Sequence, residues 1–207
     1  VIFGRAGAGK TTVAEAVVRS SEAGSCFGID LDVCVPGWMR ENFGKGIYPT
    51  LEERLEFARD CCDYADGELA RHRGVCVVSF SFVNPDLREA WASRFPQTQW
   101  FLLDTPPDVA QQRVQARKGH FYKGNPAALD GSGGDDERVG TAAAASKGND
   151  NNQWAFAPVD FPHTALDGTQ PVSANARVIL DEILRANARH AAAAEGVSSA
   201  RRISSRL

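Results

Sequence analysis

The chain has 207 residues, 43% of them hydrophobic, and a formal net charge of −3, which is enough for one α/β domain with a sizeable core. No basic excess recommends nucleic acid as a partner, and no apolar run is long enough to span a membrane. Five scattered cysteines without metal-ligand spacing, and no signal-peptide pattern, favour a cytoplasmic protein whose cysteines are reduced packing residues.

A glycine-rich turn opens the chain. Residues 4–11 read G-R-A-G-A-G-K-T, and they fit the phosphate-loop pattern G-x-x-x-x-G-K-[ST] at every fixed position. Residues 1–3 read as the end of a buried strand and residues 12–19 as a helix with one apolar face, which is the context that this pattern requires. The alternative is a chance glycine-rich turn before a helix.

The amino-acid sequence of this turn suits the binding of a triphosphate. Its glycines let backbone N–H groups turn inward, and the following helix adds the partial positive charge of its N-terminus. Lys10 can reach the β- and γ-phosphates of ATP, and the Thr11 hydroxyl can ligate Mg²⁺. The residues of this segment predicted to bind the nucleotide are Gly7, Ala8, Gly9, Lys10, Thr11 and Thr12.

The next element is a short apolar strand over residues 26–32, which ends in Asp30 and Asp32. Strand alternation predicts both carboxylates on one face, at the strand end where open α/β sheets bind ligands. One carboxylate there can hold Mg²⁺ through its water shell, and the other can deprotonate an attacking hydroxyl. The alternative is a solvated loop rich in aspartate.

Residues 36–49 carry three glycines, three aromatics and Arg40, and they predict a mobile segment that covers a substrate rather than a core element. Thr50 and Glu53 then form a predicted capping box at the start of a long helix. Arg54 lies off the apolar stripe of that helix, either as a solvated arginine or as one that binds a carboxylate or phosphate. The predicted stripe is Leu51, Leu55, Ala58, Cys62, Ala65 and Leu69.

Residues 74–80 form a continuous apolar run, which is typical of a strand buried on both faces of a parallel sheet. Further strands are predicted at 100–103 and 164–167. Helices are predicted to start at Asn84 with Pro85 in the first position, at Thr105 with a second capping box, and at Gln170. Strands alternate with helices, so we expect an α/β fold of three layers, with a five-stranded parallel sheet and helices on both faces.

Two stretches lack the patterns of a packed element. Residues 123–152 have no apolar periodicity and predict a disordered or loosely ordered insertion. After Ala188 the chain is rich in alanine and then basic, which indicates a frayed end rather than a nucleic-acid-binding arm.

Residues 113–121 read R-V-Q-A-R-K-G-H-F and resemble the lid of gluconate kinases, which carry an R-x-x-x-R-K/x-G-H-F run after the fourth strand. Other segments look like family motifs in the same order. They are residues 30–32 (D-L-D against D-G-D), 46–54 (G-I-Y-P-T-L-E-E-R against G-x-P-L-x-D-x-D-R), 79–88 and 166–172. The resemblance covers residues 1–123 and 160–185. The chain departs from the family near Val35, where a histidine is expected, and near Asn84, where a lysine is expected.

The resemblance implies a P-loop kinase of the shikimate and nucleoside monophosphate kinase-like group. Its single domain would span 1–190, with a substrate-binding segment at 36–72, a lid at 113–160 that contains the insertion near 124–152, and a flexible tail at 191–207. The implied catalytic residues are Lys10, Asp32 as the base and Arg117, with Arg113 over the adenine or near the phosphates. The implied acceptor-binding residues are Asp32, Arg40, Arg54, Arg88 and His120, and the implied metal ligands are Thr11 and Asp30.

The favoured function is therefore transfer of the γ-phosphoryl group of ATP, with Mg²⁺, to a hydroxyl of a sugar acid or related polyol. The partner would be a small-molecule substrate, without nucleic acid or membrane, and the protein a monomer or homodimer. Two alternatives stay open: a shikimate-type or nucleoside monophosphate kinase, and a regulatory protein that binds ATP without transferring phosphate to a metabolite.

Overall fold

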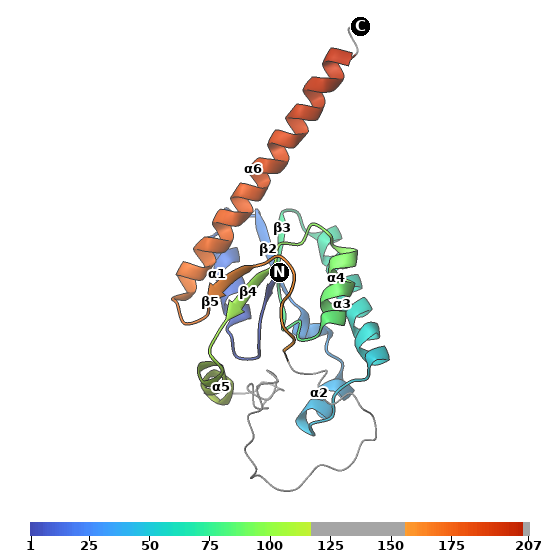
Figure 1. The fold of residues 1–207 in the computed structure, drawn as a ribbon, viewed down its shortest axis with the longest axis vertical. Helices are drawn as coiled ribbons and strands as arrows, with labels where there is room; N and C mark the ends of the chain where they lie inside the picture. Colours follow the sequence, from blue (N-terminus) through green and yellow to red (C-terminus); the bar gives the residue numbers. More distant parts are fainter. Residues whose placement is uncertain (117–155, 205–207) are drawn as a thin grey trace.

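The structure is a computed structural model that describes residues 1–116 and 156–204, with side chains as far as residue 189. Its centre is a parallel sheet in the strand order β2-β3-β1-β4-β5 (Figure 1). All neighbouring strands in that order run parallel, which confirms the predicted α/β fold with five parallel strands. The strands are β1 (Ile2–Phe3), β2 (Cys26–Asp30), β3 (Val75–Ser79), β4 (Phe101–Asp104) and β5 (Thr164–Asp167).

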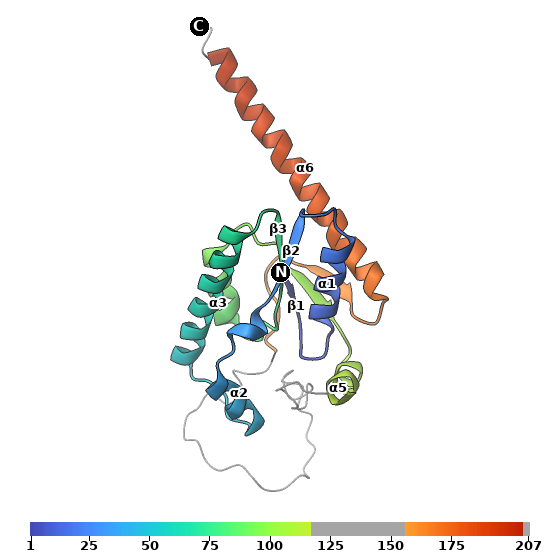
Figure 2. The ribbon, with the colours of Figure 1, turned by 180° about the vertical axis from the view of Figure 1, so that it is seen from behind.

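Helices cover both faces of the sheet, and each face has its own apolar core. Helices α1 and α6 lie together on one face, around Val17 and Ile179 (Figure 2). Helices α3 and α4 lie on the other face, around Phe57 and Trp91. The helices are α1 (Lys10–Ser20), the 3₁₀ turn η1 (Leu31–Cys34), α2 (Gly37–Gly44), α3 (Leu51–Arg71), α4 (Pro85–Arg94), α5 (Pro107–Ala116) and α6 (Val172–Ser204).

Strand β3 shows how side chains alternate between the two cores. Val77 belongs to the core under α1 and α6, whereas Val78 belongs to the core under α3 and α4. A strand covered on both faces reads as a continuous apolar run, so the prediction for 74–80 is confirmed. The same alternation places Ser79, the last residue of β3, on the α1 face.

Helix α3 begins as predicted but buries a different face. The capping box is present, because Glu53 N–H donates to Thr50 Oγ1 at 3.3 Å and Thr50 N–H donates to Glu53 Oε2 at 2.7 Å. The predicted stripe is wrong at its ends, since Leu51, Leu55 and Leu69 are exposed. The residues that α3 buries are Arg54, Phe57, Ala58, Cys61, Cys62 and Ala65. Arg54 and Phe57 lie on the buried face of α3, so the leucines of the predicted stripe lie toward solvent.

Three further boundaries differ from the expectation. Strand β2 ends at Asp30, and the chain then turns into η1, so Asp30 and Asp32 do not share a strand face. The segment 36–49 contains helix α2, whose Met39 is 1% exposed and anchors it in the core. Helix α6 continues to Ser204, across most of the expected tail at 191–207.

The cysteines behave as packing residues. All five are free, and burial raises the pKa of the Cys62 and Cys76 thiols to about 11, so both stay protonated at neutral pH. In the part of the chain that the structure describes, no helix combines the length and apolarity that a membrane crossing needs.

Candidate nucleotide-binding and catalytic site

The loop between β1 and α1 has a backbone that only glycine accepts. Gly7 has φ 82° and Gly9 has φ 102°, both in the left-handed region. A Cβ at Gly7 would lie 2.2 Å from Ala110 O of α5, so this glycine also permits a close approach of α5 to the loop. Helix α1 starts at Lys10 with no side-chain cap and no acidic residue in its first turn. Its first N–H groups and its positive end therefore face the loop, which is the arrangement that binds phosphate.

Lys10 and Thr12 lie where the phosphate-loop pattern predicts. Lys10 Nζ donates to Arg5 O at 2.9 Å, across the mouth of the loop. Thr12, in the first turn of α1, is exposed. Ala8 is buried, at 1% exposure, and presents its carbonyl to the protein rather than to solvent.

Thr11 and Asp30 meet at the carboxyl edge of the sheet. Thr11 Oγ1 donates to Asp30 Oδ2 at 2.7 Å, so the loop hydroxyl and the carboxylate are brought together from α1 and β2. Among the described residues no cluster of three His, Cys, Asp or Glu side chains could hold a metal. One carboxylate, one hydroxyl and the phosphates of a nucleotide are nevertheless a donor set that suits Mg²⁺, which keeps several of its waters.

Asp32 follows in η1 and is tied to its surroundings through the backbone. Its N–H donates to Asp30 Oδ1 at 3.0 Å, so Asp30 caps the 3₁₀ turn with one oxygen and meets Thr11 with the other. Arg40 Nη2 donates to Asp32 O, and Arg40 Nε donates to Val35 O at 2.9 Å. The structure thus places Arg40 on the carbonyls of η1, where it fixes the turn that carries Asp32.

Residues after β4 support the loop from behind. Arg113 Nη1 donates to Ala8 O at 3.0 Å, and Arg113 Nη2 donates to Gly168 O at 3.0 Å in the turn after β5. Thr105, expected to cap α5, instead donates its hydroxyl to Ala8 O at 3.3 Å, while Pro106 O accepts the first bond of the helix. The second predicted capping box is wrong, because α5 begins at Pro107, so Pro106 and not Thr105 directly precedes the helix.

Arg54 and Arg88, expected at the acceptor, are both buried. Arg54 is 5% exposed; its Nε lies 2.8 Å from Asp86 Oδ2 and its Nη1 donates to Pro49 O at 3.0 Å. Arg88 is 4% exposed, and its guanidinium lies 5.0 Å from the centre of the Phe156 ring. The carbonyls that accept from Arg88 are those of Phe82, Val83, Ala157 and Pro158. Arg88 joins the start of α4 to the segment before β5, and its expected contact with an acceptor stays a prediction.

The segment between β3 and α4 holds features that sequence reasoning missed. Phe82 has φ 45°, a left-handed conformation that is strained for an aromatic residue. Ser79 Oγ and Asn84 Oδ1 are buried polar atoms without a hydrogen-bond partner in the part of the chain that the structure describes. Asn84 precedes α4, as predicted, but its side chain does not cap the helix. The only sequence signal was that both are polar residues beside a buried strand.

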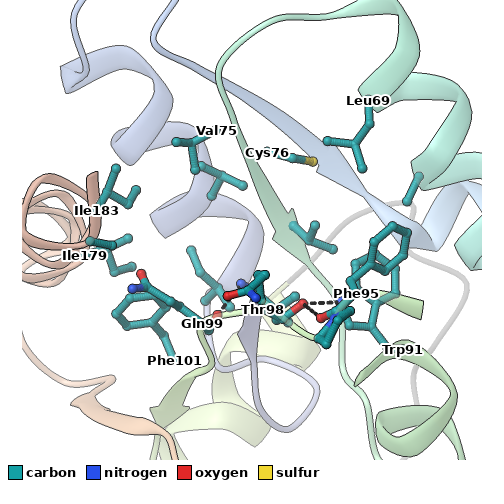
Figure 3. Close-up of a pocket in the computed structure, with 18 of the residues that line it drawn as sticks. Leu69, Val75, Cys76, Trp91, Phe95, Thr98, Gln99, Phe101, Ile179 and Ile183 are labelled. Atoms are coloured by element: carbon teal, nitrogen blue, oxygen red, sulfur yellow. Dashed lines mark hydrogen bonds between the residues drawn. The ribbon is translucent and has the colours of Figure 1, made fainter. Parts of the chain in front are cut away.

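One cavity lies at the carboxyl end of the sheet and another at its amino end. A cavity of about 310 Å³ lies beside the phosphate loop at the carboxyl end of β4, with Arg5, Asp104 and His163 as its charged or titratable groups. A cavity of about 510 Å³ lies at the amino ends of the strands, lined by Val75 and Phe101 among others (Figure 3). The second cavity is apolar and lies at the end of the sheet away from Lys10 and Thr11, so we do not assign it to the nucleotide.

Arg117, His120 and most of the expected lid, with the insertion near 124–152, lie outside the described residues. Of the remaining expected site residues, the structure brings together Lys10, Thr11, Asp30 and Asp32 at the carboxyl edge of the sheet, with Arg113 behind the loop.

Comparisons with known proteins agree with the fold. The family profile described as AAA domain matches residues 1–131, and no curated protein sequence matches the chain. A sugar kinase structure from Janibacter sp. HTCC2649 is similar with a TM-score of 0.64 and 18% identity, over 87% of this chain and 90% of that one.

Two other solved structures are similar over nearly their whole length. A gluconokinase from Sinorhizobium meliloti 1021 has a TM-score of 0.58 and 22% identity, over 89% of this chain and 90% of that one. An APS kinase from Mycobacterium tuberculosis, in complex with AMPPNP and APS, has a TM-score of 0.58 and 17% identity, over 89% and 95%. At these identities the likeness concerns the fold.

Proposed function

The chain belongs to the AAA domain family and has the fold of a P-loop kinase, and from that premise we propose that it is an ATP-dependent small-molecule kinase. It transfers the γ-phosphoryl group to a hydroxyl of a sugar acid or related polyol. The observation that carries the proposal is the 2.7 Å contact between Thr11 Oγ1 and Asp30 Oδ2, with Asp32 held one turn further on. A hydroxyl, a carboxylate beside it and a second carboxylate nearby supply the polar groups that phosphoryl transfer to an alcohol needs.

The nucleotide is held by backbone more than by side chains. The N–H groups of the loop and of the first turn of α1 bind the phosphates, and Lys10 moves from Arg5 O to a phosphate oxygen. Thr11 and Asp30 would hold Mg²⁺, which would neutralise charge on the phosphates. Arg113 acts indirectly, since it holds Ala8 O and with it the curvature of the loop.

Asp32 is the proposed general base. A base in this position accepts the proton of the acceptor hydroxyl as the oxygen attacks the γ-phosphorus. Arg117 of the lid is proposed to stabilise charge on the transferring group, as the resemblance to gluconate kinases implies, and His120 to contact the acceptor. With Arg54 engaged by Asp86 and Arg88 by four carbonyls, a neutral polyol fits the acceptor side as well as a sugar acid does.

The proposal is tested with the purified full chain, MgATP and a panel of sugar acids and neutral polyols, with phosphorylated products detected by mass spectrometry. The wild type is expected to phosphorylate at least one member. Asp32→Asn should lower turnover on that acceptor by about 10²–10⁴-fold, the usual contribution of a general base, with ATP affinity nearly unchanged. Lys10→Ala should lose most turnover without lowering the melting temperature of the nucleotide-free protein, because Lys10 is only half-buried and belongs to neither apolar core.

The alternatives predict other outcomes of the same experiment. If the protein phosphorylates shikimate or a nucleoside monophosphate but no sugar acid or polyol, it is a kinase of that alternative type and the proposed acceptor class is wrong. ATP binding without transfer to any acceptor would favour the regulatory protein. If Asp32→Asn keeps near wild-type turnover, Asp32 is not the base.

A further inference from the structure

The hydroxyl of Ser79 is a buried polar group that has no hydrogen-bond partner among the residues that the structure describes. Ser79 is 1% exposed. A buried hydroxyl without a partner costs stability, and in native proteins such a group is usually explained by function or by a bound water or ion. Asn84 Oδ1 is the other atom of this kind, but Ser79 alone lies in the sheet beside the phosphate loop.

Strand register places Ser79 directly beside Asp30. In the pairing of β2 with β3, Asp30 is opposite Ser79, and Ser79 also pairs with Ile2 of β1, the strand that leads into the loop. Ser79 therefore ends β3, the strand that lies between β2, which carries the Asp30 carboxylate, and β1, which leads into the phosphate loop.

Both side chains point to the same face of the sheet. On β3, Val77 contributes to the core under α1, so Ser79, two residues on, follows it onto that face. On β2, a Cβ at Gly28 would lie 3.3 Å from Val18 of α1, and Asp30, two residues on, reaches Thr11 of α1. The hydroxyl of Ser79 and the contact between Thr11 and Asp30 thus share one corner, at the carboxyl edge and under the start of α1.

We propose that Ser79 is the third polar side chain of the Mg²⁺ site, where its hydroxyl donates to an oxygen of the magnesium shell, either a shell water or the Asp30 carboxylate. The inference rests on the proposed function, since it requires a magnesium nucleotide at this corner. Mg²⁺ holds few direct protein ligands and keeps its waters, so side chains that bind those waters help to set its affinity. A hydroxyl suits this position because rotation about one bond re-aims it.

The contact requires a small rearrangement of the loop, and Lys10 provides one. The Ser79 hydroxyl is closed to solvent, and Lys10 Nζ now donates to Arg5 O at 2.9 Å. Lys10 must leave that carbonyl to reach a phosphate, so binding of the nucleotide itself rearranges the loop that follows the strand beside Ser79.

The test compares ATP affinity with Mg²⁺ and with EDTA, by titration calorimetry, for the wild type and three variants. Ser79→Ala should lower the affinity gained from Mg²⁺ by about tenfold, the range for loss of a hydrogen bond to a charged group, and leave the affinity in EDTA unchanged. Ser79→Cys keeps the bulk but offers only a weak donor, so it should lose a similar amount. Ser93→Ala makes the same deletion on the exposed surface of α4 and should match the wild type.

Thermal unfolding without ligand supplies the second readout. Ser79→Ala should melt at or above the wild-type temperature, because it removes a buried hydroxyl that has no partner. The inference would be overturned if Ser79→Ala gained as much ATP affinity from Mg²⁺ as the wild type does. It would also be overturned if the variant lost as much affinity in EDTA as with Mg²⁺. In both cases the wild type still binds ATP, so the proposed function stands. A wild type that binds no ATP under either condition would overturn the proposed function, and this inference with it.

Discussion

Arg88 shows at the scale of one residue how a charge can serve the fold instead of a ligand. Its guanidinium donates to four backbone carbonyls, two from the β3–α4 segment and two from residues 157 and 158, and it lies over the Phe3 and Phe156 rings. Burial lowers the pKa of Arg88 to about 10. The buried charge is tolerated because its N–H groups donate to carbonyls and the guanidinium lies over aromatic rings.

We therefore predict that Arg88→Met lowers the free energy of unfolding by about 3 kcal/mol, since it leaves buried carbonyls without donors. Arg88→Lys should recover little, because a lysine cannot reach four carbonyls in two directions. Urea unfolding of both variants, with the exposed Arg59→Ala as control, measures the effect. Near wild-type stability combined with weaker acceptor binding would instead support the expected role of Arg88 at the acceptor.

At the scale of an element, η1 is held by Arg40 in addition to its own hydrogen bonds. Asp32 O accepts from Val35 N–H at 3.3 Å within the turn, and Arg40 donates both to that carbonyl and to Val35 O just after the turn. The side chain so positioned is that of Asp32, the proposed base, and Arg40 is its positioning residue.

Arg40→Ala is expected to lower kcat on the acceptor by about tenfold, the range for hydrogen bonds made by a charged donor, while KM for ATP stays close to the wild-type value. Arg40→Lys should restore only part of the loss, because a lysine is a point charge and not a planar fork. The measurement is kcat and KM for both substrates, with melting temperatures to separate misfolding from mispositioning. A loss that appears only in KM for the acceptor would indicate direct contact with substrate instead.

The elements that sequence predicted well are those whose signals are local. The parallel strands, the phosphate loop and the Thr50 capping box each depend on residues close in the chain. Contacts between distant residues are not predicted in this way. The Thr105 hydroxyl donates to Ala8 O, 97 residues away, and not to the start of α5. Arg88 donates to carbonyls that lie 69 and 70 residues later in the chain. Alternation also failed after Asp30, because nothing local to the sequence marked the change from strand to η1.

At the scale of the whole molecule, α6 has two halves in different environments. Its first half is part of the core, since Ala176, Ile179 and Ile183 are buried against the α1 side of the sheet. Its second half stands away from the body of the protein, beyond the amino ends of the strands (Figures 1 and 2). A helix without tertiary contacts is marginal in water, because most helical stability in proteins comes from packing of one face.

Removal of residues 190–207 should therefore change the free energy of unfolding by less than about 1 kcal/mol and leave MgATP affinity unchanged. Ile183→Ala, in the first half, is the contrasting variant and should cost about 2–5 kcal/mol, as buried isoleucines do. Thermal unfolding at two protein concentrations, with light scattering, distinguishes the two ways in which the second half could matter. A large loss on truncation that depends on concentration would show that the protruding helix packs against a second copy, since a monomer's stability does not depend on concentration. A loss independent of concentration would instead mean that this half packs on its own chain, against the arrangement in the structure.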